Sequence, residues 1–167
     1  MNSNDILRRI RFVFDLDDSK MIALSSSKEH KATRADISDW LKKDDDPDYK
    51  KMPDTQLALF LNNFIEEKRG KKEGASAPPL EKRLTNNMVF MKLKIALNLK
   101  AEDVLEILEL SSFKLSKHEL SAFYRKPGHK HYRACKDQVL RNFLQGLQQK
   151  HRPDSTSSNN EGFQWKT

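Results

Sequence analysis

The chain has 167 residues, a formal net charge of +7 and a mean hydropathy of −0.81. It contains only 5 glycines and 6 prolines, which excludes a collagen-like or other fibrous protein. No apolar run approaches the ~20 residues that span a bilayer, and three arginines interrupt the amino-terminal apolar stretch. Cys135 is the single cysteine, which excludes a disulfide framework. We therefore expect a soluble cytoplasmic protein without a membrane partner.

The positive charge is confined to the second half of the chain. Residues 1–73 hold 15 Lys/Arg and 15 Asp/Glu, whereas residues 74–167 hold 16 and 9. A basic half favours an acidic partner, and nucleic acid is the first of these. A solvated surface that only keeps the protein soluble is the simpler alternative.

The chain repeats itself at an offset of 83 residues. Beginning with Asn4 and Asn87, 62 pairs align without a gap and ten of them are identical. Apolar character is kept in register at many further pairs, for example Ile10 with Leu93. Two unrelated helical segments would not keep this phase across several loops, so we interpret the chain as a tandem duplication.

A polar stretch separates the two copies. It contains two glycines and two prolines within residues 70–85 and has no hydrophobic periodicity, which is typical of an exposed linker. We divide the chain into a first helical repeat (1–69), this linker, a second and basic helical repeat (86–152), and a tail (153–167). The tail is rich in serine and asparagine, and we expect it to be disordered.

The first two helices of each copy are predicted from apolar periodicity. Residues 4–15 carry apolar side chains at i, i+1, i+4, i+7 and i+8, and the equivalent helix covers residues 89–98. A short helix follows an N-cap at Asp17 or Asp18, and its equivalent begins near Ala101.

The third helix of each copy has the clearest start signal. Thr33 with Asp36, and Ser116 with Glu119, both fit a capping box. Proline and glycine predict that these helices end at residues 44–47 and 127–128.

The fourth helix of the first copy is predicted to begin with Pro53 at its first helical position and to extend to Arg69. An equivalent apolar stripe covers residues 139–147. Because no segment shows sustained strand alternation, the predicted fold class is all-α, with two tandem four-helix repeats related by pseudo-symmetry.

Several stretches together resemble a known family. They are NDILRRIRFVF, ISDWLKK, DDDPDY, NNFIEEKRGKKEG, EKRLTNN, KLKIALNLK and, as the most specific, SKHELSAFYRKPGHKHYRACKDQVLRNFLQGL. Over residues 2–152 the chain is similar to the YehS-like bacterial family, a duplicated all-helical domain of unknown function. Met52 stands where many such proteins place a cysteine, as the second copy does with Cys135. The resemblance implies a bacterial cytosolic protein without an established activity, and it supplies no catalytic residues.

Nucleic-acid binding is one hypothesis for the second copy. Helices over 101–109 and 116–126 would suit a helix-turn-helix motif, although the stretch between them exceeds the motif's usual turn of three or four residues. The equivalent helix of the first copy carries acidic side chains that would repel phosphate, so the prediction concerns the second copy alone. The candidate contacts are Lys117, Arg125, Lys126, Lys130, Arg133, Lys136 and Arg141. The alternative is that two helices at a capped turn simply pack together.

Metal binding and catalysis have little support. His129, His131 and Cys135 are only three ligands among several cations, whereas structural zinc takes four. The acidic run at 44–48 lacks the glycine and the closing glutamate of a calcium loop. Cys135 matches Met52, so we interpret it as a core position rather than a nucleophile. We expect no catalytic residue, no metal and no cofactor, and therefore a protein that is not an enzyme.

An acidic loop in the first copy indicates a second kind of interaction. Its members are Asp44, Asp45, Asp46 and Asp48. Because this loop and the basic second copy have opposite charge, they suit an unknown protein partner or a homodimer. The favoured hypothesis is a non-enzymatic interaction or adaptor protein. The alternative is a protein that binds DNA or RNA through the basic surface of its second repeat.

Overall fold

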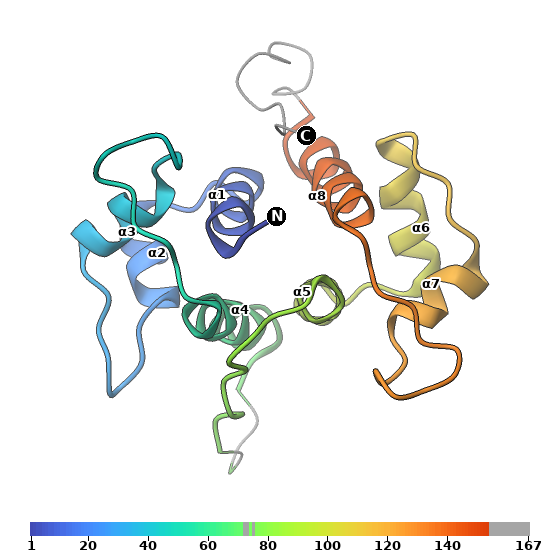
Figure 1. The fold of residues 1–167 in the computed structure, drawn as a ribbon, viewed down its shortest axis with the longest axis horizontal. Coiled ribbons are helices and arrows are strands. Elements are labelled where there is room, and N and C mark those ends of the chain that lie inside the picture. The colour runs from blue at the N-terminus through green and yellow to red at the C-terminus, as the bar shows by residue number, and fades with distance from the viewer. Residues whose placement is uncertain (72–73, 75, 154–167) are drawn as a thin grey trace. The chain divides into compact units, whose positions relative to one another are not determined.

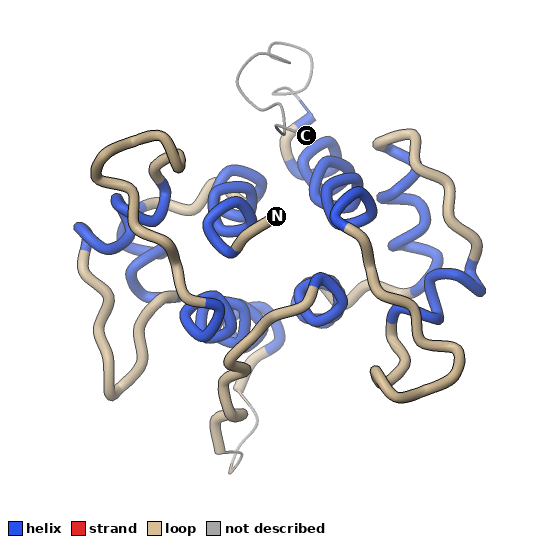
Figure 2. Tube along the Cα trace, viewed as in Figure 1, coloured by secondary structure: helices blue, strands red, loops and turns tan. Residues whose placement is uncertain are grey.

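The computed structural model describes residues 1–71, 74 and 76–153, and the regular structure in this part is helical (Figure 2). In chain order the helices are α1 (Ser3–Val13), α2 (Asp18–Leu24), α3 (Arg34–Leu41), α4 (Asp54–Arg69), α5 (Asn86–Ala96), α6 (Ala101–Leu110), α7 (Lys117–Phe123) and α8 (Asp137–His151). No strand occurs within these residues, which confirms the predicted all-α class.

The two sets of four helices begin at equivalent positions. Each helix from α5 to α8 starts 83 residues after its counterpart among α1 to α4. The chain also leaves α1 and α5 in the same way, because Asp15 and Asn98 are equivalent and have φ angles of 51° and 54°. The tandem repeat is therefore a property of the backbone as well as of the sequence.

The predicted helix starts are confirmed at α2, α3 and α7. In α3 the Thr33 hydroxyl accepts a hydrogen bond from the Asp36 amide at 3.0 Å, and the Asp36 carboxylate accepts one from the Thr33 amide at 2.9 Å. The equivalent capping box is present at α7. Asp17 rather than Asp18 is the N-cap of α2. Pro53, predicted at the first helical position of α4, is instead its N-cap residue, with an extended ψ of 146°.

Helices α3 and α7 end earlier than the predicted ends at 44–47 and 127–128. In the last turn of each helix, one carbonyl oxygen accepts a hydrogen bond from the segment that follows the loop. The Lys50 amide donates to the Asp39 carbonyl at 3.2 Å, and the equivalent Arg133 amide donates to the Ala122 carbonyl at 3.2 Å. These long-range bonds end the helices before proline or glycine is reached.

The chain divides into two compact units, the first from Met1 to Asn98 and the second from Leu99 onward. Helix α5 therefore belongs to unit 1, although it begins the second repeat. It lies against α4 (Figure 1) and buries Val89, Phe90 and Leu93. The boundary set by packing thus follows α5, whereas the boundary of the repeat precedes it.

The core of unit 1 forms where α1 and α2 each contact both α3 and α4. The rings of Phe14 and Phe64 pack in a tilted arrangement with their centroids 5.1 Å apart. The fully buried apolar side chains include Leu7, Ile10, Met21, Ile37, Met52, Leu57, Phe60 and Phe64. The apolar stripes that predicted these helices are therefore the faces that the fold buries.

The core of unit 2 forms where α6 contacts α7 and α8. Its buried side chains include Val104, Ile107, Leu108, Leu120, Leu140, Phe143, Leu144 and Leu147. Cys135 is 5% exposed and the equivalent Met52 is 1% exposed, which confirms that both are core positions.

Residues 154–167 of the predicted tail, and residues 72, 73 and 75 of the predicted linker, lie outside the described residues. Among the helices that are described, none is both long and apolar enough to cross a membrane.

Candidate functional site

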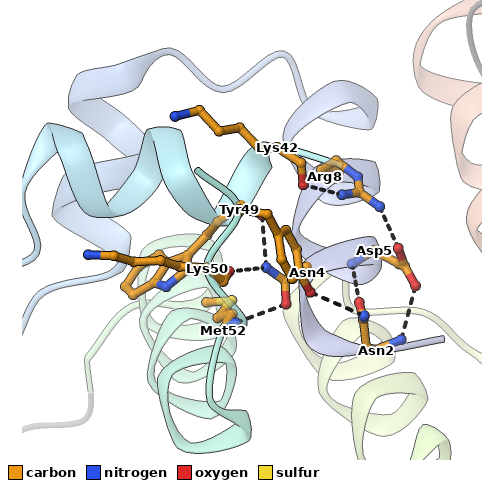
Figure 3. Close-up of polar contacts among 9 residues, drawn as sticks. Asn2, Asn4, Asp5, Arg8, Lys42, Tyr49, Lys50 and Met52 are labelled. Carbon is orange, nitrogen blue, oxygen red and sulfur yellow. Dashed lines mark hydrogen bonds and ion pairs between the residues drawn. The ribbon is translucent and has the colours of Figure 1, made fainter. Parts of the chain in front are cut away.

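The acidic loop of unit 1, residues 42–50, is fixed to α1 by a buried asparagine (Figure 3). The Asn4 amide nitrogen donates to the carbonyl oxygens of Trp40 at 3.0 Å and Lys50 at 2.8 Å. The Asn4 carbonyl oxygen accepts from the Met52 amide at 2.9 Å. Arg8 adds a bond from its guanidinium to the Lys42 carbonyl at 2.7 Å. Both ends of the loop are therefore held by side chains of one helix.

The equivalent loop of unit 2, residues 125–133, has the same internal hydrogen bonds. The amides of Asp46 and Tyr49 donate to the carbonyls three residues earlier, as do the equivalent amides of His129 and Tyr132. In unit 1 the Asp46 carboxylate also accepts from the Asp48 amide at 2.9 Å. In unit 2 the His129 Nδ1 atom accepts from the His131 amide at 3.0 Å. Imidazole thus replaces carboxylate in the same turn.

The two loops carry opposite charge on this shared backbone. Residues 42–50 hold three lysines and four aspartates, whereas residues 125–133 hold four Lys/Arg and no acid. Asp44, Asp45 and Asp48 are exposed, and Asp46 is half-buried. Arg125, Lys126, Lys130 and Arg133 are all exposed. The structure therefore gathers the predicted acidic residues in one loop and four of the seven predicted basic residues in its counterpart.

The first loop takes part in local ion pairs, whereas three cations of the second loop form none with the described residues. In unit 1 the Lys42 ammonium lies 2.8 Å from the Asp39 carboxylate and 3.9 Å from that of Asp48. The Lys42 hydrogen bond is the main cause that lowers the pKa of Asp39. In unit 2, Arg125, Lys126 and Lys130 form no ion pair with any residue that the structure describes.

A cleft of about 430 Å³ lies beside the loop of unit 2. Ala122 and Phe123 form its apolar lining. Its basic and ionisable lining consists of His118, Glu119, Lys130, His131 and Arg133. Glu119 closes the α7 capping box, and its hydrogen bonds to Ser116 are the main cause that lowers its pKa, with smaller contributions from Arg133 and His118. The cleft therefore contains one carboxylate, which is hydrogen-bonded at the start of α7, and several positive or ionisable groups.

The remaining predicted basic residues lie apart from this loop. Lys117 begins α7 and its ammonium lies 2.8 Å from the Glu102 carboxylate, so its charge is already compensated. Lys136 is exposed at the N-cap of α8. Arg141 is half-buried in α8, and its Nε atom is buried without a hydrogen bond among the described residues. At the end of α7 that a helix-turn-helix would direct at bases, Lys117 is therefore already paired with an acidic side chain.

The histidines and the cysteine do not form a metal site in the part of the chain that the structure describes. No group of three His, Cys, Asp or Glu side chains in it is arranged to hold an ion. His129 and His131 have ring centroids 5.5 Å apart, but Cys135 is buried. Burial raises the pKa of the Cys135 thiol to about 12, which disfavours the reactive thiolate at neutral pH.

Sequence reasoning missed the importance of one position in the helix that precedes each loop. Asp39, which accepts the Lys42 hydrogen bond, is replaced in unit 2 by Ala122. The signal was present in the offset of 83, because Asp39 and Ala122 are a matched pair. Its meaning depends on the contacts of Asp39, which only the structure supplies.

Comparison with known proteins identifies the family of this chain but assigns no activity to it. The family model described as "Protein of unknown function (DUF1456)" matches twice, over residues 3–70 and 86–152. The chain is 43% identical over 147 residues to "Uncharacterized protein YehS" of Escherichia coli (strain K12), an alignment that covers 88% of this chain and 94% of that protein. No solved structure matches.

Proposed function

The chain belongs to this duplicated family without an assigned function, and we propose that it is a non-enzymatic cytosolic adaptor that binds different partners through its two loops. The observation that carries the proposal is the pair of equivalent loops, which share hydrogen bonds and differ in charge. Both loops are exposed, so a partner has access to each. Opposite charges on one scaffold select opposite partners, since complementary potentials favour binding and like charges oppose it.

The proposal is tested by changing the charge of one loop at a time. The first variant replaces Asp44, Asp45, Asp46 and Asp48 by asparagine, which keeps the acceptor that the turn needs at residue 46. The second replaces Arg125, Lys126 and Lys130 by glutamate. We expect affinity capture from the native host to lose a different partner with each variant, also after nuclease treatment. An unchanged set of captured proteins with both variants would contradict the adaptor proposal.

A second candidate function is nucleic-acid binding by the loop of unit 2. It is favoured by the three cations Arg125, Lys126 and Lys130, which lack ion pairs with the described residues. Phosphate contacts release counterions, so affinity for a single strand should fall with salt with a slope of about 0.7 per contact. We expect fluorescence anisotropy of a labelled oligonucleotide to show this slope for the wild type and no binding for the glutamate variant. Binding that is insensitive to salt would exclude this function.

A further inference from the structure

We propose that His129 is a pH-sensitive switch in the loop of unit 2, residues 125–133. Its neutral imidazole closes a turn by accepting a hydrogen bond from the His131 amide, and its protonated imidazole releases that amide. The inference concerns the conformation of the loop and holds whichever partner the loop binds. It rests on the two matched loops, which use a carboxylate for this contact in unit 1 and an imidazole in unit 2.

His129 is the centre of the turn in which it lies. Its amide donates to the Lys126 carbonyl at 2.9 Å, and its carbonyl accepts from the Tyr132 amide at 3.0 Å. Its Nδ1 atom accepts from the His131 amide, also at 3.0 Å. Both histidines are exposed, so solvent protons reach the ring that closes the turn. Of these three hydrogen bonds, only the one made by the side chain is lost when the imidazole is protonated.

The bond is lost because Nδ1 changes from an acceptor to a donor. A neutral imidazole that accepts at Nδ1 carries its proton on Nε2, whereas both nitrogens of an imidazolium carry a proton and donate. The protonated ring of His129 therefore presents a donor to the donor of His131. An imidazole ordinarily titrates at about pH 6.5, so the two forms exchange close to neutral pH.

The equivalent turn of unit 1 is the internal reference. There the Asp46 carboxylate accepts from the Asp48 amide at 2.9 Å, and the two backbone bonds of Asp46 have the same pattern as those of His129. A carboxylate ordinarily stays charged, and therefore stays an acceptor, down to about pH 4. Between about pH 8 and about pH 5 we therefore expect the turn of unit 2 to open and the turn of unit 1 to remain closed.

Charges within the loop of unit 2 add to the effect of the lost bond. Protonation places a positive charge in a segment that contains no acidic residue. The His131 ring, whose centroid lies 5.5 Å from that of His129, adds a second charge when it is protonated. The cations already present in the loop are Arg125, Lys126, Lys130 and Arg133. Repulsion among these groups favours the open turn at low pH.

Helix α7 brings two further ionisable groups to the cleft that His131 lines, namely His118 and Glu119. The Glu119 carboxylate accepts a hydrogen bond from the Ser116 amide at 3.2 Å. Neither His129 nor His131 forms an ion pair with Glu119 or with any other carboxylate that the structure describes. The ring of His118 is a separate source of pH dependence, which the experiment has to resolve from that of His129.

Opening the turn changes what the loop offers to a partner. The released His131 amide becomes available as a donor, and each protonated ring adds a positive charge to an exposed surface. Both changes favour an acidic partner at low pH. The switch therefore gives one of the two loops a dependence on pH that the other lacks.

The experiment is an NMR titration of the full chain from about pH 8 to about pH 5, a range that spans the ordinary titration of imidazole. In the neutral state, two-bond proton–nitrogen correlations should place the proton of the His129 ring on Nε2, as the hydrogen bond requires. On acidification the His131 amide proton should move upfield with the midpoint of the His129 ring, and the Asp48 amide should not move. A neutral His129 ring protonated on Nδ1, or a His131 amide that does not follow the His129 midpoint, would overturn the proposal.

Three substitutions separate the bond from the neighbouring charges. His129→Asp gives unit 2 the acceptor of unit 1 and should abolish the pH dependence of the amide at residue 131. His131→Asn removes the second ring of the loop and should leave that dependence in place. Asp46→His is the reciprocal variant and should make the Asp48 amide move with pH. Dependence that persists in His129→Asp, or that disappears in His131→Asn, would assign the effect to another ring and contradict the switch.

Nitrogen-15 relaxation measures whether the turn opens. In the wild type, residues 129–131 should be more mobile at the acidic end of the titration than at the alkaline end, and in His129→Asp the mobility should be the same at both. Equal mobility at the two ends in the wild type would show that the turn stays closed without the side-chain bond, which would overturn the proposed opening.

Discussion

Gly146 of α8 lies directly against the backbone of Ile107 in α6. A Cβ atom at residue 146 would stand 2.0 Å from the Ile107 carbonyl oxygen and 2.8 Å from its carbonyl carbon. The equivalent residue in unit 1, Asn63, instead bridges to α2 and the loop after it, through hydrogen bonds to the carbonyls of Leu24 at 2.8 Å and Ser26 at 3.0 Å. The same position of the repeat thus sets a polar contact in one unit and a close helix crossing in the other.

Gly146→Ala should destabilise unit 2. The Cβ atom would collide with backbone, which cannot move aside as a flexible side chain can, so we expect a loss of about 3 kcal/mol in unfolding free energy. Urea unfolding followed by circular dichroism measures this loss. Gly128→Ala is the control, because a Cβ atom there meets nothing within 4 Å. A neutral result for Gly146→Ala would mean that α6 and α8 pack less closely than described.

Asn4→Ala should destabilise unit 1 and loosen the acidic loop. The substitution leaves the carbonyls of Trp40 and Lys50 and the Met52 amide without their Asn4 partner (Figure 3). Because Asn4 is fully buried, we expect a cost of about 3 kcal/mol in unfolding free energy. Hydrogen exchange should also quicken at the Met52 amide.

Asn142→Ala is the control for the Asn4 substitution. The Asn142 side chain makes one exposed bond to the Gln138 carbonyl within its own helix, so its removal should change the unfolding free energy by less than about 0.5 kcal/mol. Equal costs for the two substitutions would show that Asn4 has no special role in holding the loop.

Glu102→Gln should release the charge of Lys117. The two side chains are 61% and 69% exposed, so the ion pair contributes little to stability and the melting temperature should not change measurably. If the start of α7 contacts nucleic acid, the variant should bind an oligonucleotide more tightly and with a steeper dependence on salt. If the start of α7 does not contact nucleic acid, Lys117→Gln in the wild-type background should have almost no effect. The reverse pattern, in which Lys117→Gln abolishes binding, would restore the helix-turn-helix interpretation.

Local features of the fold were predictable from the sequence, and long-range features were not. The capping box of Thr33 and Asp36 depends on residues within one turn, so its pattern is visible in the chain. The end of α3 depends on the Lys50 amide, which reaches the Asp39 carbonyl across a loop. The assignment of α5 to unit 1 likewise follows from its contact with α4, which no periodicity reveals.

The candidate site was predictable in part for the same reason. The charges of the two loops follow from composition and from the offset between repeats. The compensation of Lys117 by Glu102 joins different helices, and the significance of Ala122 depends on what Asp39 contacts in the other unit. Sequence patterns therefore identify which residues are charged, but the structure identifies which charges are already paired.

Cys135 should make unit 2 less stable in alkaline solution. Burial raises the pKa of its thiol to about 12, above its ordinary value, so the folded state keeps the proton that the unfolded state loses. The contribution of the protonated thiol to the stability of the folded state is complete below the unfolded pKa of about 8.5 to 9. It is lost as the pH rises through the pKa of the folded state. Between pH 8 and 10 this linkage should reduce the unfolding free energy by about 1.5 kcal/mol.

Cys135→Ala isolates this effect, because the variant keeps every other titrating group, including Tyr124, whose pKa is also raised by burial. The difference in unfolding free energy between wild type and variant should therefore shrink from pH 8 to pH 10, when both are measured by urea unfolding. At pH 8 the folded wild type should also react with a thiol reagent far more slowly than the urea-unfolded chain. A constant difference across this range, or rapid labelling of the folded protein, would show that the Cys135 thiol is reached by water.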